Sequence, residues 1–307
     1  MLSERVRGSG ESVHGYTIRS MQQKILLIAG IGHSGSTILD MALGCHPAVV
    51  GLGEVSKVLR TPLEVLRGER HEHSLCSCGS KASECEFWRP LLPWLSDNHA
   101  LPLHSKYEKL LAQFRERFGE DRLLLDSSKT VRPYQAWLNR HHHLRAIHLA
   151  RDVRSWIDSR RRGHDARDKG GTLRLAGRWW RGNRRTEKFL AKNRIPTFNL
   201  GYEELATAPE AMLRKLCAWL KLDFDPAMLS PADTGSHIIR GNRVYKDSDH
   251  ARTIRYDARW MTSSRLILQS PLLLPLAACN RRLVYANTPD GASGTNHFFT
   301  DNQDRNS

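Results

Sequence analysis

The sequence predicts an α/β fold of three layers, with a central, mostly parallel sheet flanked by helices. Short runs of strand-forming residues alternate with segments of helical periodicity along residues 23–287. A glycine-rich loop joins the first predicted strand to the first helix, and later strands also end in polar turns. Because the carboxyl ends of parallel strands meet at one sheet edge, we expect the ligand site there.

The composition fits one soluble domain over residues 23–287 with unstructured ends. Residues 1–22 and 288–307 are polar and without periodicity, so we expect a disordered leader and a disordered tail. No apolar segment typical of a signal peptide occurs near the start, which favours a cytoplasmic enzyme. The longest apolar run, residues 266–278, is too short for a membrane span and contains two prolines, so we expect it in the core.

The charge balance favours an anionic ligand. Lys and Arg outnumber Asp and Glu by 47 to 32, which gives a formal net charge of +15. Such a balance attracts nucleic acid, anionic membranes or a phosphorylated small molecule, and charge alone does not choose among them.

The first predicted strand, residues 25–28, runs into the glycine-rich loop and a helix over residues 38–43. Backbone N–H groups at such a helix N-terminus bind phosphate or sulfate, and glycines let the anion approach the backbone. Gly30 and Gly35 have the spacing of the nucleotide triphosphatase loop, but Ser36 stands where that loop has lysine. The loop is therefore an anion cradle without the lysine that reaches a triphosphate.

Two charged residues follow the next predicted strands. Residues 49–54 form a short strand ending at Glu54, where a general base would be useful, although a helix cap is the ordinary role of such a carboxylate. Residues 122–126 form a buried strand that runs into a polar turn with Lys129, a cation that could stabilise a transferring group or simply be solvated. Between them, residues 55–105 are an insertion that we expect to shape an acceptor pocket.

A second anion grip follows the predicted strand at residues 144–150. If a helix begins at Asp152, Ser155 and Ser159 lie on one face with Arg151 at its mouth. Arginine and serine together bind phosphate oxygens well, so Arg151 and Ser159 are expected to converge on one anion. A basic amphipathic helix that happens to contain serine is the alternative.

The rest of the chain continues the alternation. Residues 160–194 are basic and contain Trp179 and Trp180, a pattern of single-stranded nucleic acid platforms but more often of a solvated helix face. A strand at residues 195–200 and a helix at residues 209–220 follow, and a last helical region begins at residue 257.

Three cysteines lie close together in the insertion. Cys76, Cys78 and Cys85 follow His71 and His73, which makes a zinc site of three cysteines and one histidine one interpretation. The Cys-x-Cys spacing departs from the usual gap and the fourth ligand is not defined, so a local cysteine cluster without metal is favoured.

Taken together, these stretches resemble the sulfotransferases that use 3'-phosphoadenosine 5'-phosphosulfate, and the likeness covers roughly residues 24–285. The loop resembles their 5'-phosphosulfate loop, Arg151 with Ser159 their 3'-phosphate motif, and Tyr202 in Tyr-Glu-Glu-Leu the tyrosine element that borders the nucleotide. Gly-Asn-Arg ending at Arg243 is similar to a segment of bacterial members. The loop residues are Gly32, His33, Ser34, Gly35, Ser36 and Thr37.

The resemblance implies a P-loop-like fold, 3'-phosphoadenosine 5'-phosphosulfate as co-substrate, and transfer without a metal. It implies that Glu54 is the base that takes the proton of the acceptor and that Lys129 is the transition-state lysine. His33 stands where the family usually has Lys or Arg, and it can carry charge beside an anion.

The implied acceptor presents a hydroxyl or amine on a carbohydrate, lipid, peptide or small metabolite, and no nucleic acid partner is expected. A P-loop nucleotide kinase and a basic nucleic-acid-binding protein are the alternatives.

Overall fold

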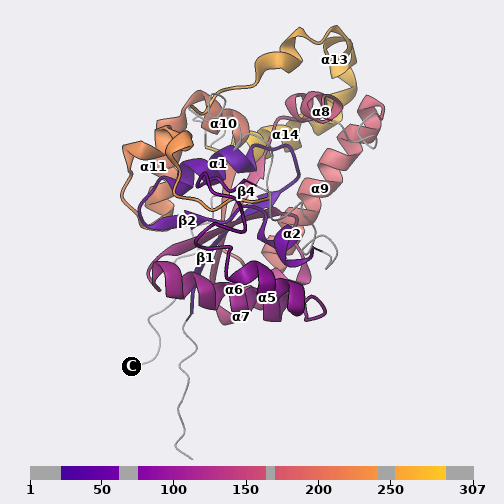
Figure 1. Cartoon of the computed structure of the whole chain (residues 1–307). Helices are drawn as coiled ribbons and strands as arrows, with labels where there is room; N and C mark the ends of the chain where they lie inside the picture. The colour runs from indigo at the N-terminus through magenta and orange to yellow at the C-terminus, as the bar shows by residue number, and fades with distance from the viewer. Residues whose placement is uncertain (1–21, 62–74, 164–169, 241–252, 288–307) are drawn as a thin grey trace, which may run out of the picture.

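The computed structural model describes residues 22–61, 75–163, 170–240 and 253–287. Its centre is a sheet of five strands in the order β2-β3-β1-β4-β5, and every pair of neighbours is parallel (Figure 1). The strands are β1 (Lys24–Gly30), β2 (Val49–Gly51), β3 (Leu123–Lys129), β4 (His143–Ala150) and β5 (Thr197–Gly201). The predicted α/β architecture is confirmed.

Helices connect the strands and cover both faces of the sheet (Figure 1). The α-helices are α1 (Ser36–Gly44), α2 (Val55–Leu59), α5 (Leu91–Asp97), α6 (Leu103–Phe118), α7 (Pro133–His141), α8 (Val153–Arg161), α9 (Thr172–Lys192), α10 (Tyr202–Thr207), α11 (Pro209–Leu220), α13 (Ser264–Gln269) and α14 (Ala277–Val284). The 3₁₀ segments are η2 (Pro226–Leu229), η3 (Pro231–Asp233), η5 (Ala258–Thr262) and η6 (Ser270–Leu276).

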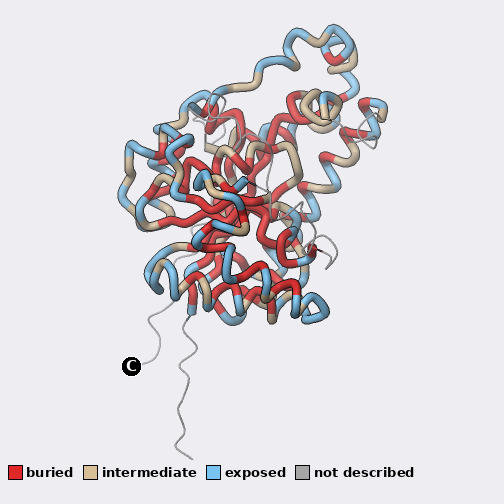
Figure 2. The backbone as a smooth tube through the Cα atoms, in the orientation of Figure 1, coloured by how far each residue is buried: buried red, intermediate tan, exposed pale blue. Residues whose placement is uncertain are grey.

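The two faces of the sheet carry separate hydrophobic clusters, which makes three layers. Ile25 and Leu27 of β1 pack toward α2, α5, α6 and α7, whereas Leu26 and Ile28 pack toward α1, α10 and α11. Because side chains alternate along a strand and both faces are covered, the strand is a continuous apolar run. Figure 2 shows the resulting band of buried residues through the middle of the molecule.

The insertion covers one face of this sheet. Phe87 and Trp88 are fully buried in the cluster around α5 and α6. Its role in acceptor binding stays a prediction, and residues 62–74, with His71 and His73, lie outside the described residues. The predicted tail, all of the predicted leader except residue 22, and Arg243 lie outside them as well.

Two predictions about local structure were wrong. The predicted polar turn at Ser127–Lys129 is the end of β3, because Lys129 pairs with Ala29 of β1 after a register shift. The apolar run at residues 266–278 lies only partly in the core: Leu266 is buried, but Leu268 and Leu274 are 80% and 70% exposed. The run is divided among α13, η6 and α14, so only some of its side chains face inward. Within the described ranges, no helix has the length and apolar character that a membrane span requires.

Asp40 of α1 is a buried carboxyl that makes stability depend on pH. Burial raises the pKa of Asp40 to about 7, although hydrogen bonds from Ser127 and Ser236 oppose the rise. From about pH 4 to about pH 7 the folded chain keeps a proton that the unfolded chain has lost, so this contribution to stability falls as the pH rises.

We expect Asp40→Asn to be less sensitive to alkaline pH than the wild type. Between about pH 5 and about pH 8, the free energy of unfolding should fall less in the variant than in the wild type, and the difference should be on the order of 2 kcal/mol. Urea denaturation at both pH values measures this difference, in which any pH-independent cost of the amide cancels. Asp97→Asn, at an exposed position of α5, is the control and should follow the wild type. Parallel curves for wild type and Asp40→Asn would contradict the assignment.

Candidate active site

The loop between β1 and α1 has three residues with positive φ angles, two of which are glycines. Gly30, His33 and Gly35 have φ angles of 152°, 72° and 90°. A Cβ atom on Gly30 would lie 2.4 Å from the carbonyl oxygen of Leu149, and one on Gly35 would lie 2.6 Å from the ring of Tyr202. The loop is therefore pressed against the ends of β4 and β5, at the carboxyl edge of the sheet.

The N-terminus of α1 has the properties of an anion site. Ser34, Ser36 and Thr37 are buried around it, and Gly35 occupies the N-cap position. The first N–H groups of a helix have no intrahelical acceptor. The hydroxyl of Ser34 is buried and has no hydrogen-bond partner among the described residues. A phosphate or sulfate oxygen in this loop would satisfy these donors.

Arg151 ties the start of α8 to this loop. Asp152 caps α8 by accepting a hydrogen bond from the Arg154 N–H at 2.9 Å. The Arg151 Nε atom donates to Ser155 Oγ at 2.8 Å, and Nη1 donates to the carbonyl of His33 at 3.2 Å. The expected helix, with Arg151 at its mouth, is confirmed, and the arginine is buried beside the glycine-rich loop.

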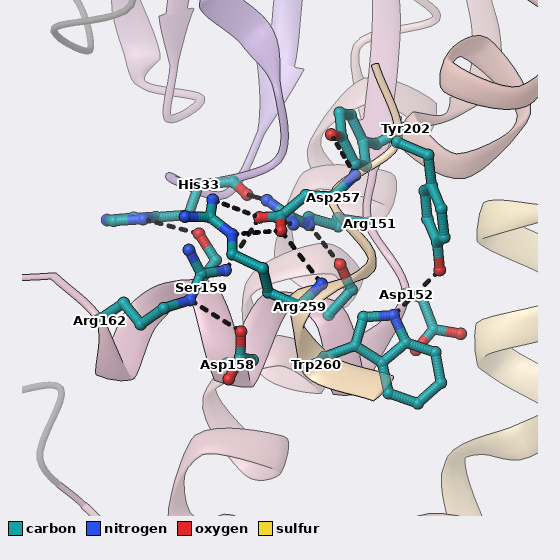
Figure 3. A network of polar contacts seen from close by, with 12 residues as sticks. His33, Arg151, Asp152, Asp158, Ser159, Arg162, Tyr202, Asp257, Arg259 and Trp260 are labelled. Atoms are coloured by element: carbon teal, nitrogen blue, oxygen red, sulfur yellow. Dashed lines mark hydrogen bonds and ion pairs between the residues drawn. The ribbon is translucent and has the colours of Figure 1, made fainter. Parts of the chain in front are cut away.

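Ser159 and Tyr202 complete the group on this side. The Ser159 Oγ atom lies 3.3 Å from His33 Nδ1, and the guanidinium of Arg151 lies 4.5 Å from the centre of the Tyr202 ring. Arg151 and Ser159 thus converge on His33, one on its carbonyl and the other on its imidazole (Figure 3). The structure brings together four residues that the sequence placed in one site.

Asp257, which sequence reasoning missed, lies at the centre of this cationic group. Its carboxylate accepts hydrogen bonds from Arg151 at 3.0 Å, Arg162 at 2.8 Å and Arg259 at 2.7 Å (Figure 3). Burial alone would raise the pKa of Asp257, but these arginines outweigh burial and hold it well below its usual range. A carboxylate held by three guanidinium groups marks a place where anionic oxygens are strongly stabilised.

Glu54 and Lys129 meet on the other side of the loop. Glu54 occupies the N-cap position of α2, but its side chain accepts a hydrogen bond from Lys129 Nζ at 2.7 Å and also pairs with Lys57. Glu54 is buried, which raises its pKa, but the attraction and hydrogen bonds of Lys129 and Lys57 outweigh burial and leave the pKa below its usual value. A buried, ionised carboxylate beside a lysine is able to accept a proton.

Backbone contacts hold this pair in place. The Ser127 N–H donates to the carbonyl of Gly53 at 2.9 Å, so the segment before Glu54 runs along β3. Ser128 Oγ accepts a hydrogen bond from the first turn of α2, from the Ser56 N–H at 2.9 Å. Glu54, at the N-cap of α2, and Lys129, at the end of β3, are 75 positions apart in sequence and are therefore fixed side by side.

Strand order places the two groups on either side of β1. Lys129 of β3 is level with Ala29, and Leu149 of β4 is level with Gly30. The loop that leaves β1 consequently has the Glu54–Lys129 pair on one side and Arg151 on the other, which suits a ligand with anionic groups at two points.

The comparison with protein families agrees with this geometry. The family model described as "Sulfotransferase family" matches residues 26–226, more than half of the chain. The chain belongs to the sulfotransferase family. It is a sulfotransferase, and its family implies 3'-phosphoadenosine 5'-phosphosulfate as the co-substrate.

A solved structure of low sequence identity shares its fold. The sulfotransferase domain from the curacin biosynthetic pathway is 20% identical, with a TM-score of 0.52, over 81% of this chain and 98% of that domain. The sulfotransferase domain of the Synechococcus PCC 7002 olefin synthase is 21% identical, with a TM-score of 0.44, over 83% of this chain and 94% of that domain. No curated protein matches the chain.

The basic run that suggested nucleic acid binding has a structural role in this sulfotransferase. In α9, Trp179 is fully buried and donates to the carbonyl of Arg151 at 2.8 Å, whereas Trp180 is partly exposed and lies under the guanidinium of Arg184. The two rings do not form one stacking platform. The helix instead supports the segment that carries Arg151.

Proposed function

We propose that this sulfotransferase moves the sulfuryl group of 3'-phosphoadenosine 5'-phosphosulfate to a hydroxyl or amine of its acceptor. The observation that carries the proposal is the position of two cationic groups on opposite sides of one anion-binding loop. The 5'-phosphosulfate is assigned to the loop between them. The sulfuryl end is assigned to Glu54 and Lys129, and the 3'-phosphate to Arg151 and Ser159.

The residues present fit this donor. The hydroxyl of Ser34, which has no partner in the part of the chain that the structure describes, and the N-terminus of α1 suit the 5'-phosphosulfate. Arg151 gives a planar fork for a second phosphate, and the Tyr202 ring at the loop gives a flat apolar surface beside it. Gly32 and Thr37 belong to the cradle, and Arg243 is assigned to the nucleotide from the family resemblance alone.

The chain itself supplies a base and positive charge. When bound, the donor supplies an activated sulfuryl group with a phosphate as leaving group. Glu54 in its ionised form accepts the proton of the acceptor, while Lys129 and the loop amides stabilise charge on the oxygens around sulfur. His33, held by Ser159, contributes a hydrogen bond at the leaving side. With this charge supplied by the protein, we propose that transfer needs no metal ion.

The environment of the acceptor is assigned more broadly. The insertion at residues 55–105 begins directly after Glu54 and is proposed to border the acceptor, which is a carbohydrate, lipid, peptide or small metabolite. The cysteines of the described residues are free thiols, which is typical of the cytoplasm, and we propose that the enzyme works there.

Calorimetric titration tests the donor. We expect 3'-phosphoadenosine 5'-phosphate to bind with an affinity at least about tenfold above that of ATP with Mg²⁺, because Arg151 is proposed to recognise the 3'-phosphate, which ATP lacks. Equal affinities, or binding of ATP alone, would contradict the proposed donor and favour a kinase-type site.

A further inference from the structure

Three cysteines and a histidine converge beside β2, outside the group around the glycine-rich loop. The Sγ atoms of Cys76, Cys78 and Cys85 and a ring nitrogen of His237 all lie within 4.8 Å of one another. Cys78 Sγ lies 3.8 Å from Cys85 Sγ, and Cys85 Sγ lies 3.2 Å from His237 Nδ1. All except Cys78 are buried.

The two shortest of these distances are close to those between the ligand atoms of a tetrahedral metal site. Zinc–sulfur bonds of about 2.3 Å at tetrahedral angles place two sulfurs about 3.8 Å apart, and a sulfur and a nitrogen about 3.5 Å apart. A disulfide would need two sulfurs at about 2.05 Å. Three thiolates and one imidazole form a complete ligand set for structural zinc. We propose that the enzyme binds one Zn²⁺ ion through Cys76, Cys78, Cys85 and His237.

The unusual Cys-x-Cys spacing is explained by a tight hairpin. Leu75 pairs with Lys81, the Cys76 N–H donates to the carbonyl of Ser80 at 2.8 Å, and Gly79 has a φ of 88° with open space where a Cβ would be. The Gly79 N–H donates to the carbonyl of Cys76 at 3.0 Å, so residues 76–79 form a turn that brings Cys78 back beside Cys76.

The hairpin is fixed to the segment that carries the histidine. The Ser77 hydroxyl accepts a hydrogen bond from the Ile238 N–H at 2.8 Å and donates to the carbonyl of Ser236. The hairpin is therefore attached to both neighbours of His237, which holds the ligands of the two segments together before any ion binds.

His237 is held in the orientation that a ligand requires. Its Nδ1 faces Cys85, and its Nε2 lies 3.9 Å from a carboxylate oxygen of Glu86, the kind of partner that metal-bound histidines have on their second nitrogen. Its backbone carbonyl accepts a hydrogen bond from Trp88 Nε1 at 2.6 Å, and its N–H donates to Gly51 at 2.7 Å. The imidazole is therefore oriented from both the side chain and the backbone.

The ion would join segments that are far apart in sequence. Cys85 and His237 are 152 positions apart, and closing so long a loop is a large contribution to folding that a metal can make. The same segment continues to Arg240, whose carbonyl accepts a hydrogen bond from the Glu54 N–H at 2.9 Å. Zinc would thus stabilise the segment to which the backbone of Glu54 is hydrogen-bonded.

Metal analysis of the full chain tests the proposal. The enzyme is purified under reducing conditions without chelator, and zinc is measured by inductively coupled plasma mass spectrometry. We expect about one zinc ion per chain, and in the Co²⁺-substituted enzyme the thiolate charge-transfer and tetrahedral ligand-field bands of a cysteine-rich site. Cys85→Ser and Cys78→Ser should lower zinc affinity at least about 100-fold. Cys217→Ser, at a buried cysteine of α11, should retain wild-type affinity.

Several results would overturn the zinc site. They are a wild-type enzyme that neither carries zinc nor retains added zinc after dialysis, and a Co²⁺ spectrum without thiolate bands. Co²⁺ bands that Cys78→Ser leaves unchanged would overturn it as well. Because Cys78 is exposed, this variant does not depend on repacking of the core, and it decides the matter if Cys85→Ser does not fold. Zinc content is measured without turnover, so the result is independent of the sulfuryl donor and of the role of Glu54.

Discussion

Glu54→Gln is expected to lower kcat by about 10²- to 10⁴-fold, the range that a general base contributes, while 3'-phosphoadenosine 5'-phosphate should bind as it does to the wild type. The amide has the size of the carboxylate and keeps an oxygen for Lys129, which bonds Glu54 Oε1 at 2.7 Å. It cannot accept the proton of the acceptor. Steady-state kinetics with the sulfuryl donor, together with calorimetry of the product nucleotide, measures the two quantities separately.

The lysines around Glu54 give a matched pair of variants. Lys129 and Lys57 both contact the Glu54 carboxylate, but the Lys129 side chain is 13% exposed at the end of β3 whereas that of Lys57 is 58% exposed on α2. Lys129→Met should lower kcat by on the order of 10²-fold or more, because it removes positive charge from the reacting end. Lys57→Met should change kcat by only a few-fold. Equal losses in the two variants would mean that both lysines act only by holding Glu54.

Lys57→Met also changes the pH profile in a defined direction. Attraction from the two lysines keeps the pKa of Glu54 below its usual value despite burial. Activity should therefore fall only as the pH drops below the ordinary glutamate value of about 4.3. Removing Lys57 takes away part of the attraction, so the acid limb moves to higher pH, whereas a carboxylate unrelated to turnover would leave the limb in place.

The sequence predicted the architecture because local signals and the fold agree. Buried parallel strands are continuous apolar runs. The segment at residues 25–28 is such a run because both faces of β1 are covered. The helix at Pro209–Leu220 begins at a proline and was predicted with its observed bounds. Glu54, Lys129 and Arg151 could be proposed from the sequence because each lies at or just after the end of a strand, and parallel strands bring such residues to one edge.

The residues that the sequence did not place correctly lacked such a local signal. Asp257 joins the site through contact with Arg151, 106 positions earlier, and nothing in its neighbours distinguishes it from a helix cap. His237 approaches Cys85 only in the folded chain, so the cysteine cluster had no defined fourth ligand. The leucines at residues 266–278 were expected inside because hydrophobicity alone does not show which turns of a segment face solvent.

The cluster around Asp257 determines how the 3'-phosphate should be tested. Arg151 is the buried member of the cluster, and it also contacts Ser155 and the carbonyl of His33. Arg259 bonds the same carboxylate, but its side chain is 69% exposed. Replacing each arginine by methionine removes one charge beside Asp257 in both cases, and only the first removes a donor that faces the glycine-rich loop.

Arg151→Met is therefore expected to weaken binding of 3'-phosphoadenosine 5'-phosphate by about 10- to 100-fold, the value of one or two hydrogen bonds to a charged group. Binding of adenosine 5'-phosphate, which lacks the 3'-phosphate, should change by only a few-fold, and Arg259→Met should affect both nucleotides little. Calorimetric titration of the two variants with both nucleotides gives the four values. Equal weakening of both nucleotides by Arg151→Met would show that the arginine only supports the loop through His33, and the 3'-phosphate would then have to be bound elsewhere.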